Sequence, residues 1–258
     1  SSSHGRRTSA SGSLDRRYDT VTEHMFVRWK EPLVGEWLSI EVDGAQTRAY
    51  LAVPESAKGP AVLVCHAWWG LTEFITELCE RLAAEGFVAL SADMYGGRTA
   101  ATIAEAEALV GTLSEDHQRA AALAAHDALT AHPAVTGERV GAIGFSMGAW
   151  AALNTAALRP DSVAAVVLFY GAAEADFTAA RAAVLGHYAP GDEWEEDKWV
   201  NWLEGELRAA GHEVTFHWYE GAGHWFFEDN RPDAYHPDAA RLAWERTLTF
   251  LRDRLKQS

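Results

Sequence analysis

A chain of 258 residues has the length of one large α/β domain, and its 48% of hydrophobic residues can fill a sizeable core. The net charge of −15, from 37 acidic and 22 basic side chains, argues against a nucleic-acid partner because a polyanion would be repelled. No apolar run is long enough to span a membrane, so we expect a cytoplasmic protein without a membrane partner.

The first 20 residues are rich in serine and glycine, which is typical of a disordered tail or of a remnant of an expression vector. We expect residues 21–258 to form a single α/β domain, whose first segment, 21–36, wraps its surface as an irregular lead-in. Cys65 falls in an apolar strand and Cys79 on the inner side of a helix, so we expect both to be buried free thiols.

Short alternating or apolar segments predict a sheet of about seven or eight strands. Residues 37–53 alternate on either side of Asp43-Gly44, which indicates an antiparallel hairpin at a sheet edge. Most of the later segments are continuously apolar, as expected for parallel strands that are covered on both faces. The predicted strands are 37–42, 47–53, 61–65, 87–90, 140–145, 163–169, 184–188 and 214–219.

Predicted helices lie between most of these strands. Gly86 and Gly211 each end one helix, and Pro133 ends another. The alternation of strands and helices implies a mostly parallel sheet with helices on both faces, in which ligands bind beyond the carboxyl ends of the strands. The predicted helices are 72–85, 101–113, 115–131, a buried helix from 149 onward, 194–210 and 238–255.

The pentapeptide Gly144-Phe145-Ser146-Met147-Gly148 stands between a buried strand and a buried helix. A G-x-S-x-G in this place predicts a serine on a strained turn, with its hydroxyl above the sheet. The flanking glycines allow strand and helix to approach closely, and the helix N-terminus favours negative charge at the hydroxyl. We therefore predict that Ser146 is a nucleophile.

A serine hydroxyl is a poor nucleophile unless a base takes its proton, and the base needs an acid to fix its tautomer. His224 is the candidate base, because it lies in a glycine-containing loop after the last predicted strand. The other histidines after Ser146 have simpler interpretations. His187 and His217 fall in predicted strands, His212 lies in a solvated turn, and His236 is a helix cap or a surface residue.

In a hydrolase of this type the acid lies between the serine and the histidine in the chain. Asp192, in the loop after the strand at 184–188, is the first candidate. Its rivals are Glu174 and Asp176, which follow the preceding strand, and Asp229, which lies close behind the histidine.

An oxyanion hole needs two backbone N–H donors, one of them from the residue after the nucleophile. That residue is Met147, and Trp68 is the best candidate for the second donor because it lies in the loop after the strand at 61–65. His66, at the end of that strand, could be taken for a second base, but we expect it to hold the loop by hydrogen bonding.

The runs Cys65 to Leu71 and Asp93 to Arg98, with the Ser146 pentapeptide, resemble the dienelactone hydrolase family of α/β hydrolases. The turn at Asp192, the loop at His224 and the segments 235–237 and 243–247 are also similar to that family. The resemblance covers about residues 35–255. It implies an α/β-hydrolase fold and hydrolysis of cyclic enol esters, with the catalytic positions at Ser146, Asp192 and His224.

Three positions depart from the pattern of that family. Its usual nucleophile is a cysteine where this chain has Ser146, and a glutamate commonly precedes the oxyanion residue where this chain has Ala67. The two changes fit together, because a serine leaves no thiolate for that glutamate to control. Glu228 stands where a carboxylate-binding arginine is expected and would repel an anion, and Arg98 matches a second substrate-binding arginine only loosely.

Several tryptophans near the predicted site suggest an apolar, aromatic pocket. The residues expected to contact a substrate are Trp69, Arg98, Trp150, Trp225 and Phe226. We therefore predict a serine hydrolase that cleaves a small-molecule ester or lactone through an acyl-enzyme, with no metal or organic cofactor, as a monomer or small homo-oligomer. Two alternatives stay open: a thioesterase or peptidase that uses the same residues, and a ligand-binding protein without turnover.

Overall fold

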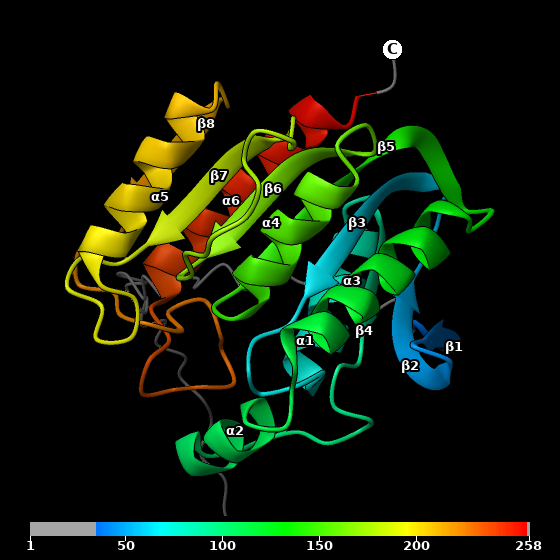
Figure 1. The fold of residues 1–258 in the computed structure, drawn as a ribbon, viewed down its shortest axis with the longest axis horizontal. Helices are drawn as coiled ribbons and strands as arrows, with labels where there is room; N and C mark the ends of the chain where they lie inside the picture. Colours follow the sequence, from blue (N-terminus) through cyan, green and yellow to red (C-terminus); the bar gives the residue numbers. More distant parts are fainter. Residues whose placement is uncertain (1–34, 257–258) are drawn as a thin grey trace, which may run out of the picture. The chain divides into compact units, whose positions relative to one another are not determined.

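An eight-stranded sheet runs through the protein, with helices on both of its faces (Figure 1). The computed structural model describes residues 35–256. The strand order is β1-β2-β4-β3-β5-β6-β7-β8, and β2 runs in the direction opposite to the other strands, so the predicted mostly parallel sheet is confirmed. The strands are β1 Glu36–Val42, β2 Ala45–Ala52, β3 Gly59–Cys65, β4 Val88–Ala92, β5 Val135–Phe145, β6 Val163–Phe169, β7 Ala183–Tyr188 and β8 Val214–Trp218.

The helices bury two apolar cores, one on each face of the sheet. The core under α1, α2 and α6 contains Phe74, Leu78 and Leu251. The core under α3, α4 and α5 contains Leu129 and Leu153. The helices are α1 Glu73–Ala84, α2 Ile103–Val110, α3 Glu115–Thr130, α4 Gly148–Leu158, α5 Asp197–Ala209 and α6 Pro237–Arg254.

The central strand β3 has no polar face because both of its sides are buried. Val62 and Val64 contribute to one core, and Leu63 and Cys65 contribute to the other. This is why the central strands are continuously apolar in sequence. Cys65 and Cys79 are buried free thiols, as predicted, and burial raises the pKa of Cys65 to about 12.

The bounds of several elements differ from the sequence-based expectation, most of all those of β5 and α2. β5 begins at Val135, five residues earlier than predicted, because Val135 pairs with Gly59 of β3 across a shift in register. α2 is shorter than the predicted 101–113. It begins after a capping box formed by Thr102 and Glu105, and it ends at Gly111.

The amino-terminal part of the described chain is the predicted hairpin. β1 and β2 pair antiparallel, and Asp43 and Gly44 turn the chain with φ angles of 51° and 78°. The predicted tail, 1–20, and nearly all of the lead-in at 21–36 lie outside the described residues. Among residues 35–256, no helix combines the length and the apolar character needed to cross a membrane.

The turn from β5 into α4 brings backbone into contact with backbone. Ser146, at the turn, has a φ of 48°, in the left-handed region that non-glycine residues rarely occupy. A Cβ atom at Gly144 would lie 2.4 Å from the carbonyl oxygen of Gly148, and a Cβ atom at Gly148 would lie 2.2 Å from that of Cys65. Only glycine fits at either position, so the predicted close approach of strand and helix is confirmed.

We expect Gly148→Ala to lower the free energy of unfolding by about 3 kcal/mol, because the added methyl group would overlap the β3 backbone. Gly205→Ala is the matched control. Gly205 lies in α5 with nothing within 4 Å of its Cβ position, so alanine should be neutral there or stabilise the helix by up to about 1 kcal/mol. Urea unfolding measures both effects, and an equal change at the two positions would contradict the backbone contact.

Candidate active site

Four loops with chemically interesting residues meet at the carboxyl edge of the parallel strands. Trp68 follows β3, Ser146 follows β5, Asp192 follows β7 and His224 follows β8. In Figure 1, the orange loop after β8 lies on the side of the sheet to which the arrowheads of β6 and β7 point. This is the edge at which parallel α/β sheets bind ligands.

Ser146, His224 and Asp192 form a hydrogen-bonded row, which we call the serine row. The Ser146 hydroxyl donates to Nε2 of His224 across 3.0 Å, and Nδ1–H of His224 donates to Oδ2 of Asp192 across 2.7 Å. The side chains of His224 and Asp192 are only 5% and 2% exposed, whereas Ser146 is partly exposed. The imidazole is therefore fixed between an accessible hydroxyl and a shielded carboxylate.

Asp192 divides its two carboxylate oxygens between its own loop and the histidine. Oδ1 accepts the N–H groups of Trp194 at 2.8 Å and Glu195 at 3.2 Å, which leaves Oδ2 for His224. These bonds fold the segment into a turn, so α5 begins at Asp197 and not at the predicted residue 194. The same turn holds the carboxylate in place for the histidine.

The rival acids lie elsewhere. Asp176 caps the turn that follows it, and the hydrogen bond from the Thr178 side chain holds the pKa of Asp176 below its usual value. Glu174 and Asp229 are exposed. Among the acidic candidates, all of them within the described residues, the structure brings Asp192 alone into contact with His224.

The predicted oxyanion donors are Met147, at the N-terminus of α4, and Trp68, in the loop after β3. In the described part of the chain, neither backbone N–H group donates a hydrogen bond to another protein group. Most N–H groups in folded proteins are paired, and an N–H group at a helix N-terminus attracts negative charge. Both donors are thus available to an anion formed at the serine row.

Two of the histidines outside the serine row have the contacts that their sequence positions predict. Buried His66 donates from Nδ1 to the carbonyl oxygen of Ala67 at 2.7 Å, and its Nε2 accepts the N–H of Met94 at 3.4 Å. It therefore ties the loop after β3 to the loop after β4, and burial lowers its pKa. His236 caps α6, as predicted.

His187, which is buried in β7, hydrogen-bonds two hydroxyl groups, and desolvation lowers the pKa of its partly buried neighbour His217. His212 departs from the prediction of a solvated turn residue. Its ring nitrogens lie 2.8 and 2.7 Å from the carbonyl oxygens of Ala182 and Phe177, so it joins two loops. No group of three or more His, Cys, Asp or Glu within residues 35–256 could hold a metal ion.

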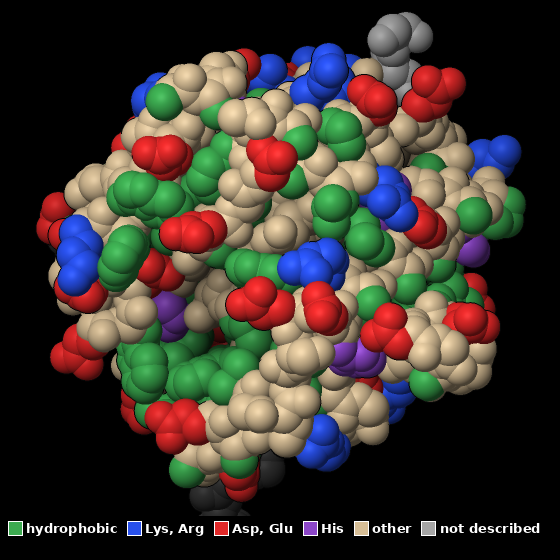
Figure 2. Space-filling view, viewed as in Figure 1, with side chains coloured by type: hydrophobic (Ala, Val, Ile, Leu, Met, Phe, Trp, Pro, Cys, Tyr) green, Lys and Arg blue, Asp and Glu red, His purple; other side chains and the backbone are tan. Residues whose placement is uncertain are grey.

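Four indole rings gather beside the serine row in a tryptophan cluster, which consists of Trp68, Trp69, Trp194 and Trp225. The rings of Trp68 and Trp225 are near-parallel, at 21°, with centroids 6.2 Å apart. Trp225 also meets the ring of His224 edge-on at 4.8 Å. Figure 2 shows hydrophobic side chains beside a hollow, over the place of the orange loop in Figure 1.

Trp194 was not among the residues predicted to contact a substrate. It lies 5.3 Å from Trp68 and 5.4 Å from Trp225, and 45% of it is exposed, so it forms the outer edge of the cluster. Trp69 forms the inner end and is buried. The signal that could have identified Trp194 is its position two residues after Asp192, which the helix prediction from residue 194 obscured.

Among the predicted substrate contacts, Phe226 is wrong, whereas Arg98 and Trp150 stay predictions. Phe226 is fully buried against Tyr219, because Trp225 adopts a left-handed φ of 63° and the next side chain turns into the core. Arg98 bonds within its own region, to the carbonyl oxygen of Tyr95 and the hydroxyl of Thr112. Trp150 lies on α4 with the guanidinium of Arg119 above its ring, 5.3 Å from the centroid.

Glu228 does not present the unpaired charge that the sequence suggested. It is buried, its Oε1 accepts the Tyr170 hydroxyl at 2.9 Å, and its Oε2 accepts Nε–H of Arg231 at 3.1 Å. Burial raises the pKa of Glu228 to about 7. The guanidinium carbon of Arg231 also lies 3.2 Å from the centroid of Trp69. The expected repulsion of anionic substrates therefore loses its structural basis.

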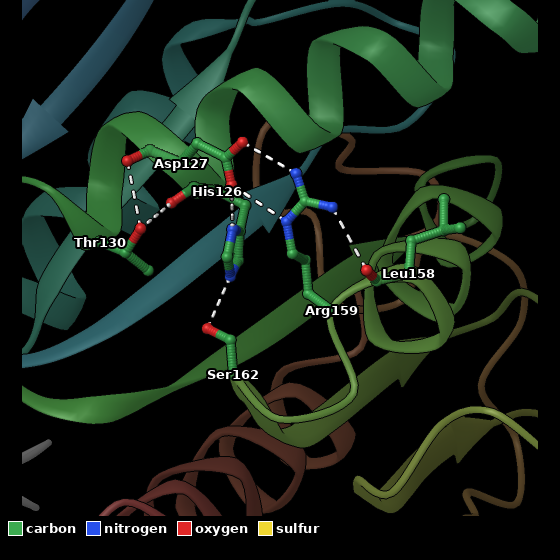
Figure 3. A network of polar contacts seen from close by, with 6 residues as sticks. All are labelled: His126, Asp127, Thr130, Leu158, Arg159 and Ser162. Atoms are coloured by element: carbon green, nitrogen blue, oxygen red, sulfur yellow. Dashed lines mark hydrogen bonds and ion pairs between the residues drawn. The ribbon is translucent and has the colours of Figure 1, made fainter.

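Figure 3 shows a second row of serine, histidine and aspartate. Because Ser162 directly precedes β6, this row lies at the amino edge of the parallel strands, opposite to the serine row. Nε2 of His126 lies 2.8 Å from Oγ of Ser162, and Nδ1 of His126 lies 2.8 Å from Oδ1 of Asp127. Arg159 binds both carboxylate oxygens of Asp127, and its carbonyl oxygen accepts the N–H of Val163, the residue after Ser162. Because the carboxylate and this N–H are already engaged, the row acts as a brace between α3, α4 and β6.

Comparisons with known proteins agree with the geometry. The sequence pattern of the dienelactone hydrolase family matches residues 47–255. A Bradyrhizobium protein described as a probable 2-oxo-3-(5-oxofuran-2-ylidene)propanoate lactonase is 33% identical over 244 residues, which cover 86% of this chain and 95% of that protein. A candidate carboxymethylenebutenolidase of Aquifex aeolicus is 31% identical over 236 residues, which cover 86% of this chain and all of that protein.

Solved structures show the same fold. A candidate dienelactone hydrolase from Klebsiella pneumoniae superimposes with a TM-score of 0.74 at 27% identity, over 84% of this chain and 98% of that one. A dienelactone hydrolase-like promiscuous phosphotriesterase from metagenomic libraries superimposes with a TM-score of 0.76 at 25% identity, over 86% and 99%. The predicted α/β-hydrolase fold is thus confirmed.

Proposed function

Because the chain belongs to the dienelactone hydrolase family, we propose that it is a serine hydrolase that cleaves a carboxylic ester or lactone through an acyl-enzyme. Membership of the family supports the hydrolysis of a lactone or an ester. The observation that carries the rest of the proposal is the serine row, with its distances of 3.0 and 2.7 Å. A hydroxyl, an imidazole and a carboxylate in this sequence are what nucleophilic acyl transfer requires.

In the proposed reaction, the Ser146 oxygen attacks the substrate carbonyl while its proton passes to Nε2 of His224. Asp192 stabilises the resulting imidazolium through Nδ1–H. The N–H groups of Met147 and Trp68 would hold the negative oxygen of the tetrahedral intermediate. His224 then protonates the leaving alcohol, and a water molecule activated by the same imidazole releases the acid and restores Ser146.

The thiols give no alternative nucleophile. Burial raises the pKa of both Cys65 and Cys79, so neither carries a thiolate near neutral pH. Ala67, where the family commonly has a glutamate, fits a site that has no thiolate to restrain.

The tryptophan cluster supports a substrate with a flat, apolar acyl or leaving group. Its rings lie next to His224, and burial of apolar surface against them would contribute about 25 cal/mol per Å². Since Glu228 is buried and paired, charge repulsion no longer argues for neutral esters over carboxylated ones, and the aromatic surface is the remaining basis for selection.

Ser146→Ala should abolish hydrolysis of 4-nitrophenyl acetate, with a loss on the order of 10⁶ in kcat, because the nucleophile is removed. A fluorophosphonate probe should label the wild-type protein at Ser146 and should not label the variant, as mass spectrometry of the peptides would show. Labelling of the variant, or retention of more than a few per cent of activity, would assign the nucleophile to another residue. A folded wild-type protein that neither reacts with the probe nor hydrolyses esters would instead favour a ligand-binding role.

Asp192→Asn should lower kcat by roughly 10⁴, because the amide leaves His224 in the wrong tautomer. Asp176→Asn is the matched control, since Asp176 also caps a turn in a loop after a strand but does not reach the histidine. Steady-state kinetics of both variants test the assignment. A larger loss for the Asp176 variant would move the acid to the loop after β6.

Trp194→Ala should raise KM for 2-naphthyl acetate about 2- to 10-fold and leave KM for methyl acetate nearly unchanged, because only the larger group reaches the outer ring of the cluster. Trp199→Ala provides the control. Trp199 is 51% exposed and packs against Trp202 outside the cluster, so its loss should affect neither substrate. Equal changes in KM for both esters would show that Trp194 does not line the substrate pocket.

A further inference from the structure

We propose that Glu228, acting through Tyr170, positions the ring of His224, so that full activity needs the Glu228 carboxylate in its ion pair with Arg231. The inference rests on the proposed function of the serine row and adds two positioning residues to it. The hydrogen bonds of the serine row involve neither Glu228 nor Tyr170. Three contacts lead outward from His224.

The first contact is between Tyr170 and His224. Tyr170 directly follows β6, is fully buried, and places its ring centroid 4.9 Å from that of His224. Its φ of 39° is a strained conformation for a tyrosine, which persists only where the surroundings impose it. Such strain is concentrated at functional sites. Tyr170 thus forms one wall of the space in which the imidazole lies.

The second contact fixes the Tyr170 ring. Its hydroxyl donates to Oε1 of Glu228 at 2.9 Å, while Oε2 accepts Nε–H of Arg231 at 3.1 Å. Both oxygens therefore act as acceptors, which is the pattern of an ionised carboxylate. Protonation would convert one of them into a donor and weaken one of the two bonds.

Glu228 gains or loses its proton in the pH range in which enzymes commonly work. Burial raises the pKa of Glu228 to about 7, and the charge of Asp229 acts in the same direction, whereas Arg231 and the Tyr170 hydroxyl oppose it. Burial raises the pKa of the Tyr170 hydroxyl well above its usual value, and the charges of Glu228 and Asp192 act in the same direction. The carboxylate, and with it the observed geometry, is thus favoured above about pH 7 and lost below it.

The third contact connects this arrangement to the predicted oxyanion loop. The guanidinium of Arg231 covers Trp69, whose neighbour Trp68 carries one of the proposed N–H donors. Tyr170, Glu228, Arg231 and Trp69 therefore link the end of β6, the loop of His224 and the loop after β3. Burying a carboxylate costs free energy. We infer that this carboxylate is kept because it connects the three segments.

Glu228→Gln tests the proposal, because the amide keeps the shape and can still accept from Tyr170 but offers Arg231 no charge. We expect kcat for 4-nitrophenyl acetate to fall about tenfold with KM changed less than twofold, since the ring is misplaced while the pocket stays intact. As the pH falls through about 7, Glu228 takes up a proton and its side chain becomes neutral, like the amide of the variant. The kcat values of the wild type and of Glu228→Gln should therefore differ about tenfold above this pH and be nearly equal well below it.

Glu80→Gln is the matched control. Glu80 accepts a hydrogen bond from the Tyr50 hydroxyl in a tyrosine–glutamate pair between β2 and α1, so its loss should leave kcat and the pH dependence of kcat unchanged. Tyr170→Phe provides a second route to the same result if Glu228→Gln folds poorly. It should lower kcat to a similar degree, and combining the two changes should add little.

Unchanged kcat in both Glu228→Gln and Tyr170→Phe would overturn the positioning role, as would a tenfold difference in kcat between the wild type and Glu228→Gln that persists well below pH 7. An equal loss of kcat in Glu80→Gln would show that the effect is general destabilisation, and it would also overturn the positioning role. These outcomes differ from a failure of the proposed function, in which Ser146→Ala would keep its activity. If Ser146→Ala is inactive while Glu228→Gln behaves as the wild type, the serine row stands and only the role of Glu228 falls.

Discussion

The contact between α4 and the ends of β3 and β5 is the constraint on which the candidate site depends. Gly144 and Gly148 let the two backbones touch, and the turn between them holds Ser146 in a left-handed conformation. The N–H of Ser146 donates to the carbonyl oxygen of Phe169 in β6, which anchors the strained residue to the next strand. The hydroxyl is therefore held by rigid elements on both sides before any other side chain contributes.

The order of the strands supplies the remaining groups. Going outward from β5, the strands are β6, β7 and β8, and the loops at their carboxyl ends carry Tyr170, Asp192 and His224. Side chains that are far apart in sequence thus meet because neighbouring parallel strands end at one edge. Asp192 contributes to this by binding its own turn with one oxygen and the imidazole with the other.

The sequence predicted those features of the site that depend on short, local patterns. The turn at Ser146 follows from the glycines around it, and Asp192 and His224 follow from the place of their loops after strands. Features set by a single backbone angle or by a distant partner were missed. The left-handed φ of Trp225 turns Phe226 into the core, and Glu228 does not present the expected repulsive charge because Tyr170, 58 positions away, binds it. Strand ends were predicted less well for the same reason, since the early start of β5 depends on pairing with Gly59.

The brace at His126 has a consequence for the recognition of enzymes by three-dimensional templates. A template that tests only the two hydrogen-bond distances between a serine, a histidine and an aspartate would match this protein twice, once at each edge of the sheet. The two matches separate as soon as main-chain atoms are included. The N–H after Ser162 is bound to the carbonyl oxygen of Arg159, whereas the N–H after Ser146 has no such acceptor among the described residues. A template search that scores the free main-chain donor next to the serine would retain one match and discard the other.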